Sequence, residues 1–127
     1  MPSTSRTPKA AFDDRLDLIF HALSDRTRRA VLDRLASGPA KVTDLAEPFA
    51  MSLPAVSKHL RVLERAGLIE RLVSGRVHQC SFGRAPLQDI ERWLERTRAF
   101  WDDRLDALTR YVGSGADIAK TKKGKGR

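Results

Sequence analysis

Basic side chains are concentrated between residues 52 and 76. This stretch carries only two acidic residues, Glu64 and Glu70, against five basic ones: Lys58, Arg61, Arg65, Arg71 and Arg76. Ammonium and guanidinium groups pair well with phosphate, so a local excess of them predicts a surface that binds a polyanion. A run of charge can also be no more than a solvated face. The position of these residues in the fold therefore decides between the two interpretations.

The segment 53–66 has the spacing of an amphipathic helix. Ser52 is a good N-cap, Pro54 falls in the first turn, and Gly67 ends the pattern. At about 100° per residue, the apolar side chains share one face, which we expect to point at the core. The opposite face is small, polar and basic. The apolar residues are Val56, Leu60 and Leu63, and the opposite face carries Pro54, Lys58, Arg61 and Arg65.

Such an outer face suits the major groove of double-stranded DNA, which is wide enough to admit a helix. The N-terminal end of a recognition helix usually reaches the base edges. Arg61 and Arg65 lie further along and are better placed for phosphates. The residues that we predict at the base edges are Ser52, Leu53, Pro54, Ala55, Ser57 and Lys58.

Two strand-like runs, 68–73 and 76–82, follow the helix and predict a β-hairpin with Ser74-Gly75 as its two-residue turn. Arg76 at the tip can enter a minor groove or pair with phosphate, and Arg71 is a second candidate for DNA contact. Alternatively, both arginines are edge-strand charges that discourage aggregation.

The rest of the chain predicts four further helices. Apolar spacing indicates a helix over 12–23, a second helix after Ser24-Asp25 that stops at Gly38-Pro39, and a long helix from Pro86 to about Val112. A third, brief helix is expected from Thr43, with Thr43 as its N-cap, because Pro48 limits its length. The order of elements is mainly α with a small β-hairpin, a winged helix-turn-helix.

The predicted organisation is a single domain between two disordered ends. Residues 1–11 form a disordered N-terminal segment, residues 12–112 the winged helix-turn-helix with a C-terminal dimerisation helix, and residues 113–127 a disordered basic tail. The net charge is +8, and residues 52–84 carry six basic against two acidic side chains. The positive charge of the folded part therefore lies in the helix and hairpin described above.

The long last helix has more apolar surface than a small winged helix can cover. Pairing with its symmetry mate, together with the first helix, would bury that surface in a homodimer. The alternative is that the aromatic residues pack within one chain. The Trp93, Phe100 and Trp101 cluster is also the one candidate for a small-molecule effector site, although interface packing is favoured. The predicted dimer interface comprises Phe12, Leu16, Phe20, Trp93, Phe100, Trp101, Leu105 and Leu108.

Other classes of protein find little support in the sequence. There is no apolar run that could span a membrane, no secretory signal and a single cysteine, Cys80, so we expect a cytoplasmic protein without disulfides. No acid–base constellation, phosphate-binding glycine loop or paired nucleophile predicts an enzyme. No cofactor is expected.

The stretch SLPAVSKHLRVLERAGLIERLVSGR closely resembles the recognition helix and wing of ArsR-type bacterial repressors. Their S-x-H-L-x-x-L-x-x-A-G-L pattern is present from Ser57 to Leu68, and FHALSDRTRRAVLDRL resembles their opening. The resemblance covers roughly residues 12–112. It implies a homodimeric winged-helix repressor that releases its operator when an effector binds.

The chain departs from the metal-sensing members of that family. KVTDLAEPFA, before the recognition helix, lacks cysteine and histidine, and the last helix has carboxylates but no histidine, so we expect no metal site. Cys80 is expected to be a small buried residue rather than a redox switch. His59 lies beside the apolar face, which favours packing or capping over DNA contact. Competing functions are a protein-interaction module and a non-specific DNA-binding protein driven by the basic tail.

Overall fold

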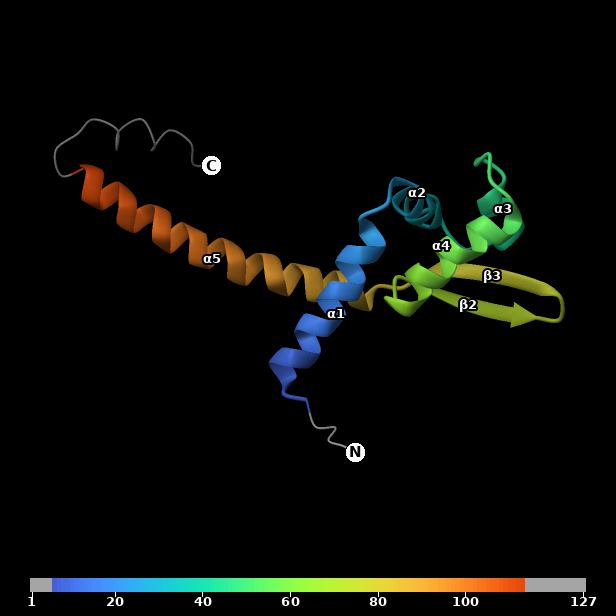
Figure 1. Cartoon of the computed structure of the whole chain (residues 1–127), viewed down its shortest axis with the longest axis horizontal. Helices are drawn as coiled ribbons and strands as arrows, with labels where there is room; N and C mark the ends of the chain where they lie inside the picture. The colour runs from blue at the N-terminus through green and yellow to red at the C-terminus, as the bar shows by residue number, and fades with distance from the viewer. Residues whose placement is uncertain (1–5, 114–127) are drawn as a thin grey trace. The chain divides into compact units, whose positions relative to one another are not determined.

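The computed structural model describes residues 6–113, which form two compact units, residues 6–90 and residues 91–113. The first unit contains α1 (Pro8–Leu23), α2 (Arg26–Leu35), β1 (Ala40–Lys41), α3 (Val42–Ala46), α4 (Leu53–Arg65), β2 (Ile69–Ser74) and β3 (Val77–Phe82), shown in Figure 1. It also holds the first turns of α5 (Ala85–Gly113), whose remainder is the second unit. The predicted mainly α fold with a hairpin is confirmed. The predicted basic tail lies outside the described residues, apart from Gly113.

Helix α1 begins four residues before the predicted start at Phe12. Thr7 caps it by accepting a hydrogen bond from the backbone N–H of Ala10 at 3.0 Å, and Pro8 occupies the first turn. Lys9 pairs with Asp13 one turn later, at 3.0 Å. Residues 8–11, which we predicted to be disordered, are therefore helical, because cap, proline and ion pair together favour an earlier start.

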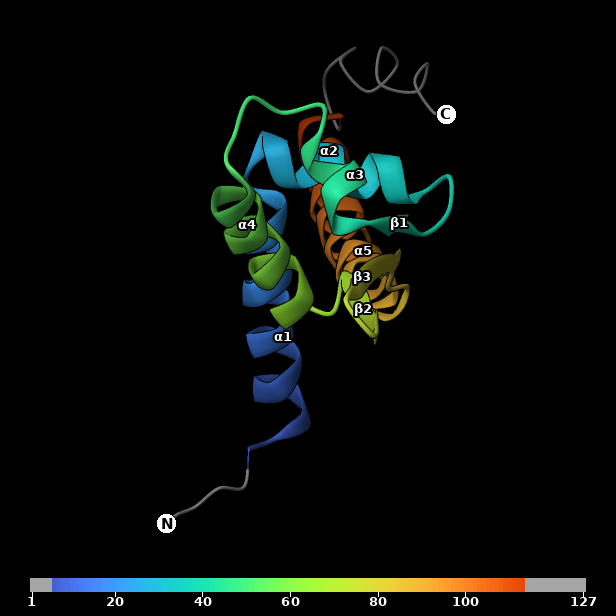
Figure 2. The same ribbon diagram turned by 90° about the vertical axis from the view of Figure 1, so that its right-hand side faces the viewer.

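The core of the first unit lies where α1, α2 and α4 meet the sheet. Figure 2 shows α4 beside α1, with α3 close to β1. The apolar face of α4 supplies three side chains without solvent exposure, as its spacing predicted. The largest fully buried side chains are Ile19, Val31, Leu45, Val56, Leu60, Leu63, Leu68, Ile69 and Cys80. Burial of Cys80 agrees with the prediction of a small core residue.

Helix α3 is brief, as Pro48 led us to expect, but its start differs from the prediction. Lys41, rather than Thr43, is the N-cap residue, and its side chain makes no capping hydrogen bond. Thr43 falls inside the helix because strand β1 delivers the backbone directly to Val42. Ser52, in contrast, caps α4 as predicted, accepting from the N–H of Ala55 at 3.2 Å.

The sheet has three antiparallel strands in the order β1-β3-β2. Strand β1, which the sequence analysis missed, pairs Ala40 with Cys80. The hairpin closes with Ser74 opposite Val77, so its two turn residues are Gly75 and Arg76 rather than Ser74 and Gly75. Gly75 has φ +64° and no other residue of the turn has positive φ, the pattern of a type II′ turn with glycine first.

Two glycines hold the base of the hairpin together. Gly67 adopts φ +78° after α4, and the N–H of Gly83 donates to the carbonyl oxygen of Leu68 at 2.8 Å. A Cβ placed on Gly83 would lie 2.1 Å from the carbonyl oxygen of Gly67. Only glycine at position 83 allows this backbone approach. The end of α4 and the end of β3 are thereby joined at one point.

The second unit is the outer part of α5, and much of its apolar surface is exposed. Phe100 and Trp101 are 51% and 55% exposed and meet edge to face, with ring centroids 5.9 Å apart. The guanidinium of Arg104 lies over the Phe100 ring at 4.7 Å. Trp93, Leu94, Leu105, Leu108 and Tyr111 add to this exposed set. Within residues 6–113, no helix combines the length and apolar character needed to cross a bilayer.

Candidate nucleic-acid interface

Helix α4 presents a basic face to solvent. Val56, Leu60 and Leu63 fill the core, while Lys58, Arg61 and Arg65 are exposed on the other side. Ser52, Leu53 and Pro54 are exposed at the N-terminal end, and Ala55 and Ser57 are partly exposed. This is the arrangement that the helical spacing predicted. Backbone N–H groups and small side chains at the start of α4 leave room for a close approach by another molecule.

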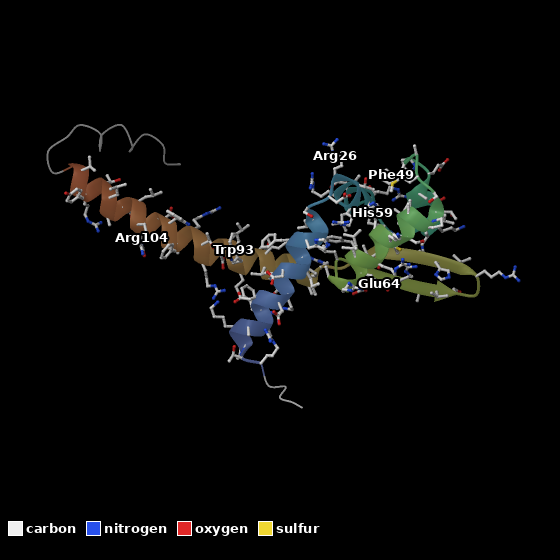
Figure 3. All side chains as sticks on the ribbon, in the orientation of Figure 1. Arg26, Phe49, His59, Glu64, Trp93 and Arg104 are labelled. Carbon is white, nitrogen blue, oxygen red and sulfur yellow. The ribbon has the colours of Figure 1, made fainter. Side chains whose placement is uncertain are left out.

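A buried arginine fixes α4 to the first two helices. Arg28 on α2 donates from Nε to the carbonyl oxygen of Ala22 at 2.7 Å and from Nη2 to that of His21 at 3.0 Å. Both carbonyls lie in the last turn of α1, and that of His21 also accepts from the N–H and the hydroxyl of Ser24. The Nη1 of Arg28 also lies 3.2 Å from Nδ1 of His59 on α4. His59 therefore packs between α2 and α4, as predicted and as Figure 3 shows.

Asp25 stabilises the same junction from its N-cap position. Its Oδ2 accepts from the N–H of Thr27 at 2.8 Å and from that of Arg28 at 3.1 Å. The pKa of the Asp25 carboxyl is lowered, chiefly by the hydrogen bond from the Arg28 backbone and further by the nearby His59. The distance from Asp25 Oδ2 to Nδ1 of His59 is 3.9 Å. The orientation of the recognition helix thus depends on a polar contact as well as on the core.

A basic recess of about 400 Å³ lies between the start of α3, the start of α4 and the hairpin. Its polar groups come from three separate parts of the chain, and none of the described residues that line it carries a carboxylate. It opens beside the exposed face of α4 and continues to the turn of the hairpin. The lining residues are Lys41, Val42, Thr43, Leu53, Ser57, Arg71, Arg76, Val77 and His78, which we call the wing recess.

Arg71 marks the inner boundary of the wing recess. It shares the inner face of the hairpin with Ile69, and its register partner is Cys80. Its side chain is 19% exposed, and its Nε lies 3.6 Å from Oε1 of Glu64 on α4. Within residues 6–113, neither Nε nor Nη2 of Arg71 has a hydrogen-bond partner. Figure 3 shows Glu64 where the end of α4 approaches the hairpin.

Arg65 is exposed on the basic face of α4 but does not line the wing recess. It lines a different cavity of about 560 Å³, formed by α1, the end of α4, the start of β2 and the first turn of α5. There, Arg15 donates to Asp89 from Nε at 2.8 Å and from Nη2 at 3.2 Å. This pairing raises the pKa of the Arg15 guanidinium. The structure therefore groups Leu53, Ser57, Arg71 and Arg76 in one recess, and Arg65 elsewhere.

Three polar residues of the wing recess were missed by the sequence analysis. Lys41 and Thr43 reach it because the two-residue strand β1 places the start of α3 against the hairpin. His78 lines it from β3. The signal in the sequence was weak: a lysine after Gly38-Pro39-Ala40, with no periodicity to reveal the strand.

Other chemistry is sparse in the described part of the chain. Burial raises the pKa of the Cys80 thiol, with Arg71 and Glu64 acting in opposite directions as smaller influences. Between residues 6 and 113, no cluster of three or more His, Cys, Asp or Glu side chains could hold a metal ion. The polar features that remain are the basic face of α4 and the wing recess.

A capped recognition helix packed across a short helix and followed by a hairpin defines a winged helix-turn-helix protein. Residues 23–71 match the family model described as a helix-turn-helix domain. The HTH-type transcriptional regulator Rv2034 of Mycobacterium tuberculosis is 38% identical over 119 residues, covering 91% of this chain and 97% of that protein. The transcriptional repressor SdpR of Bacillus subtilis is 38% identical over 76 residues, or 60% of this chain and 84% of SdpR.

Solved structures agree with these relatives. A crystal structure of an ArsR family transcriptional regulator is 41% identical, with a TM-score of 0.69, and the match covers 78% of this chain and 97% of that one. The homodimeric winged helix-turn-helix DNA-binding domain of Mb0332 from Mycobacterium bovis is 25% identical, with a TM-score of 0.57, covering 84% and 95%. The chain belongs to the ArsR family of winged helix-turn-helix transcriptional regulators. It is a DNA-binding regulator of transcription.

Proposed function

We propose that the protein is a homodimeric repressor that binds a palindromic operator in double-stranded DNA with α4 and the hairpin. The observation that carries this proposal is the basic face of α4, opposite its buried apolar face and continuous with the wing recess. A two-fold dimer places its two recognition helices about 34 Å apart, one helical turn of DNA. SdpR is named a repressor, and Mb0332 is described as homodimeric, which supports both parts of the proposal.

Each part of the interface has its own role. The start of α4 reaches the base edges, because the N-terminal end of a recognition helix enters the major groove most deeply. Arg61 and Arg65 bind phosphates further along the helix. Arg71 and Arg76 bring the wing to the DNA backbone or the minor groove. The proposed base-reading residues are Ser52, Leu53, Pro54, Ala55, Ser57 and Lys58, all on or next to the first turns of α4.

The proposed dimer uses α1 and α5. Phe20 is 41% exposed, and the α5 side chains Trp93, Phe100, Trp101, Leu105 and Leu108 have exposed area that a second copy can cover. Phe12 and Leu16 are already buried in the single chain, so they would support such an interface from beneath. Burial of apolar surface contributes about 25 cal/mol per Å². Covering these side chains with a second copy would therefore favour association.

We infer that regulation, rather than catalysis, is the whole activity, and that the protein works in the cytoplasm without a bound cofactor. An effector that prefers one dimer geometry would shift operator affinity by its difference in affinity for the two geometries. The Trp93, Phe100 and Trp101 cluster is the one candidate place for such a molecule, although interface packing remains the favoured role for these side chains.

Selection of genomic DNA fragments, followed by binding across a salt series, tests the proposed function. We expect an enriched near-palindrome whose affinity falls steeply with salt yet stays above that of random DNA at physiological salt. Lys58→Glu combined with Arg61→Glu should abolish binding and leave the dimer intact, whereas Lys9→Glu on α1 should bind nearly as the parent does. Uniform binding that disappears as salt rises would overturn the proposal.

A further inference from the structure

The wing recess differs from the open basic face of α4 in being three-sided. Lys41 and Thr43 approach it from the start of α3, Ser57 from α4, and His78 with both arginines from the hairpin. A flat charged face attracts any part of a polyanion, but a recess with donors on three sides selects a group that fits inside. Its volume of about 400 Å³ is that of a small-molecule site.

The walls of the recess have two kinds of surface. Val42, Leu53 and Val77 are apolar and partly or fully exposed, and the remaining lining residues carry N–H or O–H donors. An anion attached to a ring that has apolar C–H faces fits such walls better than a bare ion. The repeating unit of a nucleic acid backbone, a phosphate joined to deoxyribose, has this composition.

Arg71 provides donors that the protein itself does not use. Glu64 is near enough to attract the guanidinium, but at 3.6 Å it is too far to accept a hydrogen bond from Nε. A buried N–H without an acceptor is destabilising. Because Nε and Nη2 are buried, Arg71 acts on a phosphate in the recess through its positive charge rather than through a hydrogen bond from these two nitrogens.

From these observations we propose that the wing recess holds one backbone phosphate and its deoxyribose in each half of the operator, bound by Lys41, Arg71 and His78. The inference rests on the proposed function and deepens it, because it names the contact that fixes the wing on the DNA. Thr43 and Ser57 line the same recess and add hydroxyl donors. Lys41 and His78 thereby join the DNA-contacting residues.

Operator duplexes in which single phosphates are replaced by uncharged methylphosphonates test the proposal with the full-length protein. For the parent protein we expect one position in each half-site to cost about tenfold in affinity, the scale of a charge-assisted contact. For Lys41→Met the same replacement should cost less than about twofold, because the contact has already been lost. Lys9→Met, an exposed lysine on α1, serves as the matched control and should keep the parent pattern.

The outcomes separate this inference from the proposed function. If the parent protein binds an operator, and Lys41→Met and His78→Gln keep the full penalty at every position, the recess holds no phosphate and the inference is overturned. If the parent protein selects no operator at all, the proposed function fails and the inference fails with it. Both substitutions are at exposed side chains, and circular dichroism verifies that the variants fold.

The Nε–H signal of Arg71 in ¹⁵N-labelled protein distinguishes the source of the phosphate. We expect it to shift when operator DNA is added and to stay in place when inorganic phosphate is added at the same phosphate concentration. A shift of equal size with inorganic phosphate would show that a small phosphate compound is the occupant, and would overturn the assignment to DNA.

Discussion

The two units of this protein differ in how far they bury their apolar residues. In residues 6–90, the apolar faces of α1, α2 and α4 close on one another and on the sheet, leaving Val56, Leu60 and Leu63 without exposed area. In residues 91–113, a single helix keeps Phe100, Trp101 and Leu108 more than half exposed. The first unit has the core of an independent domain, and the second has an apolar surface that the described residues leave exposed. The proposed DNA-binding surface lies in the first unit, whereas the proposed dimer interface adds the exposed face of the second unit to α1.

Introducing carboxylates on the apolar face of α5 should prevent dimerisation and leave the fold of the first unit unchanged. Trp101→Glu with Leu108→Glu places carboxylates where a second copy would pack, so we expect a monomer by light scattering. Operator affinity should fall at least about 100-fold, because two linked half-site contacts become one. Asp102→Asn, an exposed change on the same helix, is the control. A double variant that remains dimeric would place the interface elsewhere.

Adding a side chain at Gly83 should destabilise the first unit instead. In Gly83→Ala, the new Cβ would meet the carbonyl oxygen of Gly67 at 2.1 Å, so the hairpin base must shift. Overpacking of this kind costs about 3 kcal/mol, which urea unfolding measures directly. Ala85→Ser, at an exposed position two residues away, should change stability little. Equal stability of the two variants would contradict the close approach.

Removing the Arg28 guanidinium tests how the first unit joins its helices. Arg28→Met keeps the apolar stem but removes the Nε–H donor to the carbonyl of Ala22 and one of the donors to the carbonyl of His21. We expect a loss of about 2 kcal/mol in the free energy of unfolding, because those carbonyls lie at a packed helix end. Arg29→Met removes a single bond, to Leu23, from a more exposed site and should cost less. The two chemical denaturation curves provide the comparison.

The smallest expected effect concerns acid. Because the folded-state pKa of Asp25 is lowered, its contribution to stability is present above the unfolded value of about 3.9 and is lost as pH falls through the folded value. Asp25→Asn keeps a capping side chain but cannot titrate. We expect its stability to decline less between pH 5 and about pH 2 than that of the parent, as followed by thermal unfolding. Asp33→Asn, on the exposed side of α2, is the control; an identical decline for Asp25→Asn and the parent would remove Asp25 from the acid response.

The recognition helix could be predicted from sequence because its signals are local. Ser52, Pro54 and Gly67 mark its ends, and the spacing of Val56, Leu60 and Leu63 identifies its buried face. The same holds for α2, whose N-cap Asp25 was visible in the sequence. The resemblance to the ArsR family predicted a regulator of transcription, which local patterns alone could not predict.

What could not be predicted depends on contacts between distant segments. Strand β1 has two residues and no periodicity, so the wing recess that it completes with Lys41 and His78 was invisible. The turn shifted by one residue because Gly75 takes the first position, where positive φ is needed. The start of helix α1 was predicted too late because its N-cap lies in a segment whose composition indicated disorder.

Gly67 and Gly83 approach closely at the base of the hairpin, and this contact makes the stability of the domain independent of the length of the wing. Gly67 and Gly83 fix both ends of the hairpin, and the core contacts lie near that base, at Ile69 and Cys80. Two residues added to each strand would keep the inward and outward faces in register and move the tip by about 6.6 Å. That distance is close to two base-pair steps along DNA, at about 3.4 Å each. Insertions of this kind can therefore lengthen the wing by about two base-pair steps, while the helices beneath stay as they are.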